Sequence, residues 1–283
     1  MKKLMNRLII FVSCLMLSGL LSETLQAESA EEIMKKSSQV THYAGEDRKS
    51  RMAMLVFHPT AKKPAKKIFI LLRKNIEDSG RQKFFLYFTY PKEVNKASFL
   101  VHKYIIEDDL RRLYLPASKE ILKISGHQKQ CAFMGSDFSS EDITGRHFAK
   151  DRHQLLREEV LEVKSKKGTL QYSTFVIESH PIVKEDKTLK TRTWVDRKSY
   201  LPIREEFTNH EGELYKTYEA IDIRSIDGYP TVTKHRMTSH LEGTHTLLFL
   251  DLKNTRYNMG MAEDIFVEKS LVETPPVIYL KKL

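Results

Sequence analysis

Two histidines that flank a predicted turn are the residues of this sequence best placed for metal chemistry. Glu242-Gly243 has the composition of a tight turn, so His240 and His245 would face each other across a hairpin. Two imidazoles at that distance can share a metal ion, but a protein zinc site takes at least a third ligand. No third ligand is evident in the sequence. His240 and His245 are therefore weak candidates, and no metal site is predicted.

The side chains that could carry catalysis have simpler explanations. Ser136-Asp137 and Glu141-Asp142 have the spacing of helix-capping residues, which accounts for them without a reaction. Cys131 lies in a loop where a nucleophile could sit, but it lacks histidine and asparagine partners at a supporting spacing, so a buried apolar role is favoured. The sequence has no GxSxG, HExxH, P-loop or dinucleotide-binding motif. It therefore predicts a protein that is not an enzyme and uses no cofactor.

The segment 113–143 contains the most distinctive order of elements in the chain. A strand at 113–115 is followed by a second short strand through 121–124. Gly126 and Gly135 then bracket a ten-residue loop. Glycine adopts backbone conformations that other residues avoid, so both positions are suited to act as hinges.

A helix start is predicted directly after this loop. Ser139 can accept hydrogen bonds from the first free N–H groups of the helix, and Asp142 can reach back to it. Phe138 and Ile143 have the spacing of a hydrophobic staple, which fixes the direction in which the chain enters the helix. A long loop that ends in a fixed helix start is typical of a functional segment.

The N-terminal residues 1–27 have the order of a secretory signal peptide: basic residues, an uncharged apolar run, and a small residue, Ala27, at the cleavage site. The apolar run is short for a membrane span. A lipoprotein signal ending at Cys14 is the alternative, but Cys14 lies inside the apolar run. We expect an exported protein with a single domain over 28–283. Cys131 is the only cysteine in that range, so no intramolecular disulfide is expected.

The chain is basic, with a formal net charge of +10. This charge is compatible with solubility alone, and also with attraction to an anionic membrane surface or an acidic partner. The basic residues are spread along the chain, which slightly favours solubility as the explanation. Nucleic-acid binding would fit the charge but not an export signal, so no nucleic-acid partner is predicted.

Most of the chain is predicted to form β-strands. Turn residues recur about every ten positions between alternating or continuous apolar segments, which is typical of an antiparallel sheet or open barrel of about ten or eleven strands. A capping box at Ser29 predicts a short N-terminal helix, and residues 262–271 are predicted to form a closing helix. Besides 121–124, strands are expected at 52–56, 68–72, 84–90, 97–105, 110–115, 170–177, 191–195, 202–207, 214–223, 231–238 and 246–252.

Two motifs within 113–143, LYLPASKEILKI and FMGSDFSSEDI, resemble the central motif of the LolA-like outer-membrane lipoprotein-sorting family. The sequence departs from the family at Lys119 and Lys123, where arginines are usual, and at Ser140, where an aromatic residue is usual. Lysine lacks the planar fork of arginine, so the two are not interchangeable in recognition. Further matching motifs follow in the family order and extend the resemblance over nearly all of 28–283: Trp194-Val195-Asp196, residues 201–207, residues 226–230 and Ile265-Phe266.

This resemblance implies a strongly curved antiparallel sheet, an incomplete β-barrel that wraps around short helices and leaves an apolar cavity for acyl chains. It further implies a periplasmic carrier of lipid or lipoprotein. Relatives are associated with inner-membrane lipid exporters of the resistance-nodulation-division (RND) type, so such a transporter is an expected partner. An accessory protein that binds the transporter and holds no lipid is the alternative function.

Three predicted strands support a cavity independently, because 68–72, 84–88 and 247–250 are apolar without alternation. A solvent-facing strand alternates apolar and polar residues, so both faces of these strands must contact apolar material. A covering helix is one explanation, but the chain has few long helical patterns, which favours a lipid-filled space. An error of one residue in the predicted register of a strand would exchange its inward-facing and outward-facing side chains. We expect the space to be lined by Phe84, Phe88, Leu248 and Leu250, or by their neighbours of opposite parity.

The loop between the two glycines offers a lid for this space. Burying Phe133 and Met134 would contribute about 3–5 kcal/mol at ~25 cal/mol per Å² of apolar area. We expect the pair to plug the cavity mouth when it is empty and to move away on Gly126 and Gly135 when lipid enters. The alternative is a loop that packs once and stays in place.

Overall fold

The structure is a computed structural model that describes residues 28–76, 80–165, 168–183 and 187–280. The predicted signal peptide, residues 1–27, lies outside the described residues. Three α-helices and thirteen strands make up the described part. None of these helices has both the length and the apolar character needed to cross a membrane.

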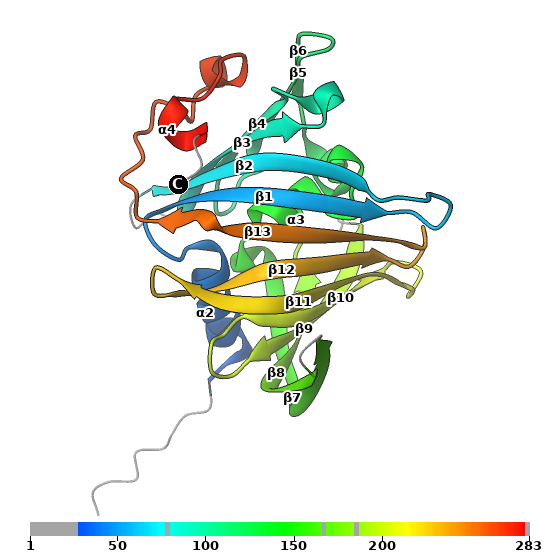
Figure 1. The fold of residues 1–283 in the computed structure, drawn as a ribbon. Helices are drawn as coiled ribbons and strands as arrows, with labels where there is room; N and C mark the ends of the chain where they lie inside the picture. The colour runs from blue at the N-terminus through cyan, green and yellow to red at the C-terminus, as the bar shows by residue number, and fades with distance from the viewer. Residues whose placement is uncertain (1–27, 77–79, 166–167, 184–186, 281–283) are drawn as a thin grey trace, which may run out of the picture.

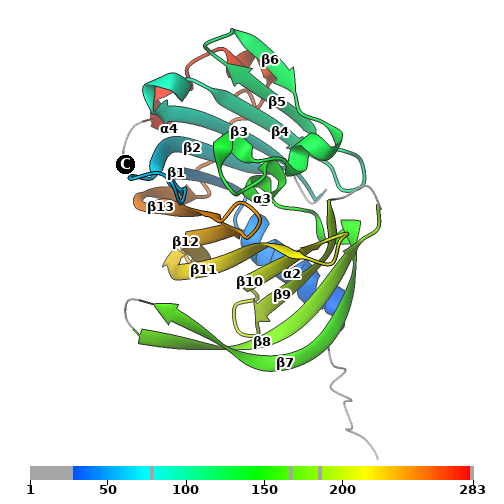
Figure 2. The ribbon, with the colours of Figure 1, turned by 90° about the vertical axis from the view of Figure 1, so that its right-hand side faces the viewer.

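The strands form one antiparallel sheet in the order β6-β5-β4-β3-β2-β1-β13-β12-β11-β10-β9-β8-β7 (Figure 1). The sheet is strongly curved and open, since β6 and β7 remain as its two edges (Figure 2). The predicted fold class is confirmed. The strands are β1 (Asp47–Phe57), β2 (Ala65–Ile76), β3 (Arg81–Tyr90), β4 (Ser98–Lys103), β5 (Leu110–Leu115), β6 (Glu120–Lys123), β7 (Asp151–Ser165), β8 (Gly168–Pro181), β9 (Thr188–Asp196), β10 (Pro202–Asn209), β11 (Leu214–Ile226), β12 (Tyr229–Ser239) and β13 (Thr244–Tyr257).

The predicted number of about ten or eleven strands is too low, since the sheet has thirteen. Each strand range expected from the sequence overlaps an observed strand, and β7 has no counterpart among the expected ranges. β7 is an edge strand that pairs with β8 along its whole length. Charged residues such as Arg157, Glu158 and Glu159 occupy successive positions, so the strand lacks a clean apolar alternation. Charged side chains on edge strands are a common protection against unwanted pairing, and here they hide the strand in the sequence.

The two faces of the sheet bury different residues. On the concave face, Phe84, Leu86 and Phe88 of β3 join the largest hydrophobic cluster. Phe85 and Tyr87, which alternate with them, point to the convex face. The C-terminal segment covers that convex face over β2, β3 and β4, and it contributes Met261, Ile265, Phe266, Leu271 and Tyr279 to the second cluster.

The covering segment buries the convex face of β2 and β3, for which a lipid contact was expected from the sequence. The continuous apolar runs of β2 and β3 do not need a lipid on their second face, because the C-terminal segment buries it. The predicted closing helix over 262–271 is also wrong: its only helical turn is a 3-10 turn at Glu268–Leu271, followed by α4 (Val277–Leu280). Ile265 and Phe266 are both buried against the sheet, so tertiary packing overrides the local helix preference.

Two helices lie on the concave side, α2 (Ala30–His42) and α3 (Ser140–Thr144) (Figure 2). The predicted capping box at Ser29 is present at the start of α2. Ile33 of α2 is fully buried and packs against Phe175, Ile177 and Val195 on β8 and β9. The hydrophobic stripe of α2 therefore fixes it to the inner face of the sheet.

Buried cations from the sheet hold the C-terminal ends of both helices. Arg73 of β2 donates to the backbone carbonyl oxygens of His42, Ala44 and Gly45, with 3.0 Å to Gly45. Lys103 of β4 donates to the carbonyl oxygens of Thr144 and Gly145, at 3.0 and 2.7 Å. Cations stabilise the partial negative charge at a helix C-terminus. Burial nevertheless lowers the pKa of Lys103 to about 8.

Candidate functional site

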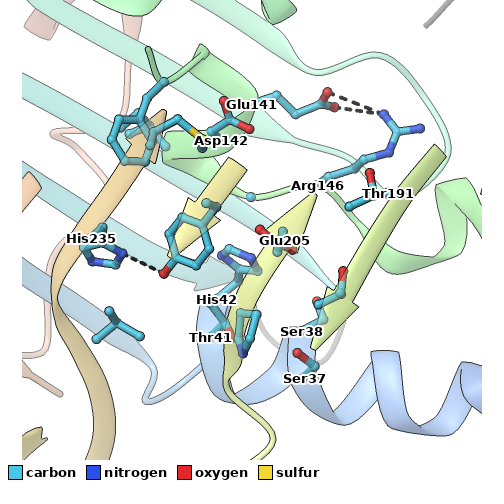
Figure 3. A pocket seen from close by; sticks show the side chains of 18 of the residues that line it. Ser37, Ser38, Thr41, His42, Glu141, Asp142, Arg146, Thr191, Glu205 and His235 are labelled. Atoms are coloured by element: carbon cyan, nitrogen blue, oxygen red, sulfur yellow. Dashed lines mark hydrogen bonds and ion pairs between the residues drawn. The ribbon is translucent and has the colours of Figure 1, made fainter. Parts of the chain in front are cut away.

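A cavity of about 250 Å³ lies on the concave side of the sheet, between the strands and helices α2 and α3 (Figure 3). An engineered apolar cavity of ~150 Å³ is large enough to bind benzene, so this space can take a larger apolar group. Its apolar wall combines side chains from β1, β2, β12 and β13 with one from the turn before β10. They are Met52, Leu71, Val232, Leu248, Leu250 and Leu201.

The structure brings two of the four predicted lining residues to this cavity. Leu248 and Leu250 point to the concave face and form part of the wall. Phe84 and Phe88 lie on the same face and in the same hydrophobic cluster, but they do not line the cavity. Contact of any of these residues with lipid stays a prediction.

The central loop covers the inner face of β3 and β4. It forms two 3-10 turns, Gly126–Gln130 and Phe133–Gly135. Phe133 is buried, with its ring centroid 6.1 Å from that of Phe88 and 5.1 Å from that of Phe99. The loop thus places Phe133 over Phe88, which explains why Phe88 does not reach the cavity.

A second cavity, of about 280 Å³, lies beneath the loop and is lined by Phe99, Leu113, Ile124, Cys131, Phe133 and Met134 among others. Phe133 and Met134 therefore border this second space and not the wall of the first one. The predicted buried role of Cys131 is wrong, because this residue is exposed. Phe133 packs inward, whereas Cys131 and Ala132, the residues just before it, are exposed.

The predicted helix start at Ser139 is confirmed. The Asp142 backbone N–H donates to Ser139 Oγ at 3.0 Å, and the Ser139 backbone N–H donates to Asp142 Oδ2 at 2.7 Å. Phe138 and Ile143 belong to the inner hydrophobic cluster, as expected for a staple, and both line the first cavity. This short helix therefore has a polar and an apolar anchor at the cavity.

The polar part of the cavity wall centres on a lysine that the sequence does not single out. Lys216 of β11 donates to both oxygens of Asp142, at 2.8 and 3.1 Å, and its ammonium lies 4.3 Å from the ring centroid of Phe207. Nearby on β10, burial and the Asp142 carboxylate raise the pKa of Glu205 to about 7, although Lys216 and a hydrogen bond with Thr193 act against this. Glu205 therefore titrates near neutral pH.

Two further polar contacts complete the wall. Arg146 lies between two carboxylates. It donates to Glu141 at 3.3 Å (Figure 3) and to Asp151 at 2.9 Å. His235 Nδ1 and the Tyr218 hydroxyl are 2.9 Å apart. Burial, with a contribution from nearby cationic Arg48, lowers the pKa of His235 to about 4, so this imidazole is neutral at neutral pH.

The expected pairing of His240 with His245 is wrong. His245 lies opposite Thr238 in the β12–β13 pair, because β12 ends at Ser239 and His240 belongs to the turn. His240 Nε2 is 2.8 Å from Thr217 Oγ1, and the His245 ring stacks on Phe57. In the described parts of the chain, no group of three or more His, Cys, Asp or Glu residues could hold a metal ion.

The curved open sheet and its covered concave cavity form a LolA-like fold. A family model with the description "Uncharacterized protein" matches residues 80–273, so the chain belongs to that family. No curated protein matches the chain.

Three solved structures share the fold. A putative outer membrane lipoprotein-sorting protein domain from Vibrio parahaemolyticus is 28% identical, with a TM-score of 0.75, over 86% of this chain and 98% of that one. A DUF1329 family protein from Desulfovibrio piger is 26% identical, with a TM-score of 0.76, over 86% and 97%. A LolA superfamily protein from Nitrosomonas europaea is 19% identical, with a TM-score of 0.67, over 86% and 100%, and this likeness shows the fold alone.

Proposed function

We propose that the protein is a periplasmic carrier that binds the acyl chains of a lipid or lipoprotein in its concave cavity and moves it across the cell envelope. The observation that carries this proposal is the apolar wall of the cavity, which Leu248 and Leu250 share with Met52, Leu71 and Val232. The similarity to a lipoprotein-sorting domain supports the class of ligand. The signal-peptide pattern in residues 1–27 supports the periplasmic location.

The wall can hold an acyl chain because it is formed by one face of several strands. Each methylene group that leaves water on binding contributes about 0.8 kcal/mol. Affinity should therefore rise with chain length until the cavity is full. A protein that recognised only a polar group would not show this dependence.

The direct test is to extract the purified protein with organic solvent and to identify any lipid by mass spectrometry. Binding of saturated fatty acids of increasing length to the delipidated protein then gives the dependence on chain length. A carrier yields acyl lipid in the extract and an affinity that increases with length. Absence of both would reject the proposal.

A pair of neighbouring substitutions separates cavity binding from surface binding. Leu248→Trp fills the cavity with a larger side chain, and we expect it to reduce binding at least about tenfold, since a filled site loses the burial of several methylenes. Leu247→Trp is the matched control, because Leu247 is the adjacent residue on the convex face and is half-buried. Equal loss in both variants would argue against the cavity as the site.

The accessory-protein alternative, in which the chain binds an RND-type transporter and holds no lipid, gains no support from the similar structures. An RND-type transporter as donor or acceptor of the lipid remains part of the carrier proposal. Co-purification of the transporter with lipid-loaded and lipid-free protein would test it, and a carrier should show different affinities in the two states.

A further inference from the structure

Along the face of helix α2 that contacts the sheet, the side chains change from apolar to hydroxyl-bearing. At its start, Ala30, Ile33 and Met34 pack in the cluster formed with β8 and β9. Residues three and four positions apart lie on the same side of a helix, so the next turns continue this stripe. They place Ser37, Ser38 and Thr41 in the cavity wall (Figure 3).

Two of these hydroxyls have no partner within the described residues. Ser38 is only 8% exposed, and Ser38 Oγ and Thr41 Oγ1 are both buried without a hydrogen bond. Serine and threonine inside a helix often donate to the carbonyl oxygen four residues earlier, yet neither does so here. Buried polar groups in proteins are normally satisfied. Two such groups in one cavity wall are available to the polar part of a bound molecule.

The same cavity wall also contains a carboxyl group from the sheet. Glu205 lines the same cavity and has the Thr193 hydroxyl as its hydrogen-bond partner. Asp142, which lies close enough to influence Glu205, already binds Lys216 through both oxygens. Two carboxyl groups therefore share one ammonium group in this part of the wall. A ligand that brings a positive charge would balance them.

Arg146 and Arg48 are the other cations of the cavity wall. Arg146 lies between Glu141 and Asp151. The Arg48 guanidinium lies 5.9 Å from the ring centroid of Tyr257, and its Nε has no hydrogen-bond partner within the described residues. A negatively charged head group at the α2 hydroxyls would meet the carboxyl groups of the wall, and Arg48 is the one of these two cations with a donor left for it. Like charges at short range oppose binding.

We propose that Ser38, Thr41 and Glu205 form a subsite for the head group of the bound amphiphile, and that this head group carries a primary ammonium. An ammonium has three donors and no acceptor, which suits a wall whose open groups are hydroxyl and carboxyl oxygens. This inference rests on the proposed function, since the chain of the same ligand would lie along Leu248 and Leu250.

The test compares three probes with the same chain: dodecylamine, dodecanol and dodecyl phosphate. Each is titrated into the delipidated full-length mature protein at neutral pH, below its aggregation concentration. Dodecylamine should bind at least about tenfold more tightly than the other two, as a charge-assisted hydrogen bond in a buried site allows. Equal affinity for all three probes overturns the subsite and leaves the lipid cavity standing. If none of the three probes binds, both the subsite and the lipid cavity are rejected.

Substitutions then locate the preference. Glu205→Gln should bring dodecylamine to the affinity of dodecanol, and Ser38→Ala with Thr41→Val should reduce dodecylamine affinity about fivefold while leaving the cavity wall intact. Glu206→Gln is the matched control. Glu206 is the next residue on β10, accepts a hydrogen bond of 2.7 Å from Arg204, and does not line the cavity. Thermal melting confirms that each variant is folded. An unchanged preference for the amine in Glu205→Gln contradicts the assignment of Glu205.

Discussion

Asp142 and Lys216 join helix α3 to strand β11 across the cavity wall. Asp142 Oδ2 accepts at 2.8 Å from the Lys216 ammonium and at 2.7 Å from the backbone N–H of Ser139. One carboxylate thus caps its own helix and ties that helix to a strand far along the chain. The central loop, which ends at Ser139, is therefore anchored at this end through the same contact.

Removing the lysine should destabilise the protein. In Lys216→Met the ammonium is lost, and the largely buried Asp142 carboxylate keeps only its capping contact. Breaking a buried ion pair by removal of one partner is strongly destabilising, and we expect a decrease of about 2–4 kcal/mol in the free energy of unfolding. Urea denaturation at neutral pH measures it.

The double-mutant cycle with Asp142→Asn supplies the control for this prediction. Asparagine can still accept at the helix start, so this variant tests the charge more than the cap. A coupling energy of about 1–3 kcal/mol between the two positions is expected for residues in direct contact. Additive effects of the two substitutions would show that the pair does not hold α3.

Arg73 should matter for helix α2 more than for the sheet. Its guanidinium binds the carbonyl oxygens at the end of α2, and methionine would fill a similar volume without these hydrogen bonds. We expect Arg73→Met to destabilise the protein by about 2–3 kcal/mol, as carbonyl groups lose charge-assisted partners. Hydrogen exchange should accelerate first in residues 37–44. A uniform acceleration over all strands would instead show that Arg73 acts as a core residue.

Local signals account for the parts of the fold that are predictable from the sequence. The capping boxes at Ser29 and Ser139 each depend on a residue three positions later, so the sequence alone is enough to find them. Strand positions follow from apolar patterns and turn residues in the same way. The sequence alone does not decide which residues of β13 face the concave side. Alternation along a strand separates two faces but does not say which of them lies inside.

The polar half of the cavity was not predictable from the sequence. Glu205 and Lys216 lie on the paired strands β10 and β11, and the packing of α3 against the concave face brings Asp142 to them. The hydroxyls of α2 carry a signal that could have been read: Ser37, Ser38 and Thr41 occupy the stripe on which Ile33 and Met34 are apolar. A stripe that turns from apolar to hydroxyl residues indicates a helix that passes from a core to a cavity.

The central loop should respond to lipid if it acts as a lid. Phe133 packs on Phe88 and Phe99, so its release would expose the inner face of β3 and β4. We expect hydrogen exchange in residues 126–138 to increase when lipid binds. Unchanged protection would support a loop that stays in place.

A glycine substitution tests the backbone of the same loop. Gly135 has φ = +69° and nothing within 4 Å of an added Cβ, so Gly135→Pro acts only through the backbone. Proline requires φ near −65°, and the variant should load and unload lipid more slowly. Gly212→Pro is a control at a turn with φ = +83° and equally open surroundings. Normal lipid transfer by Gly135→Pro would count against a lid.

The protein should lose stability in mild acid because of His235. Its folded-state pKa is lowered to about 4 by burial, whereas an unfolded histidine takes up its proton near pH ~6.5. Between these values the unfolded chain binds more protons, so the free energy of unfolding falls as the pH falls from about 6.5 to about 4. His147, whose pKa burial also lowers to about 4, acts in the same direction. Glu205 acts in the opposite direction, because its raised pKa of about 7 makes the folded state bind more protons between pH 4.5 and 7.

Replacing the imidazole isolates its share of this pH dependence. Glutamine keeps an acceptor for the Tyr218 hydroxyl but does not titrate, so His235→Gln should flatten the curve. A lowering of the pKa from 6.5 to about 4 corresponds to at most about 3 kcal/mol at 1.36 kcal/mol per pH unit. Urea denaturation at pH 7, 6, 5 and 4 gives the slope for both proteins, and His58→Gln in an exposed turn is the control. An unchanged slope in His235→Gln would mean that His235 takes up its proton equally well in the folded and the unfolded chain, and that its burial beside Tyr218 does not oppose the charge.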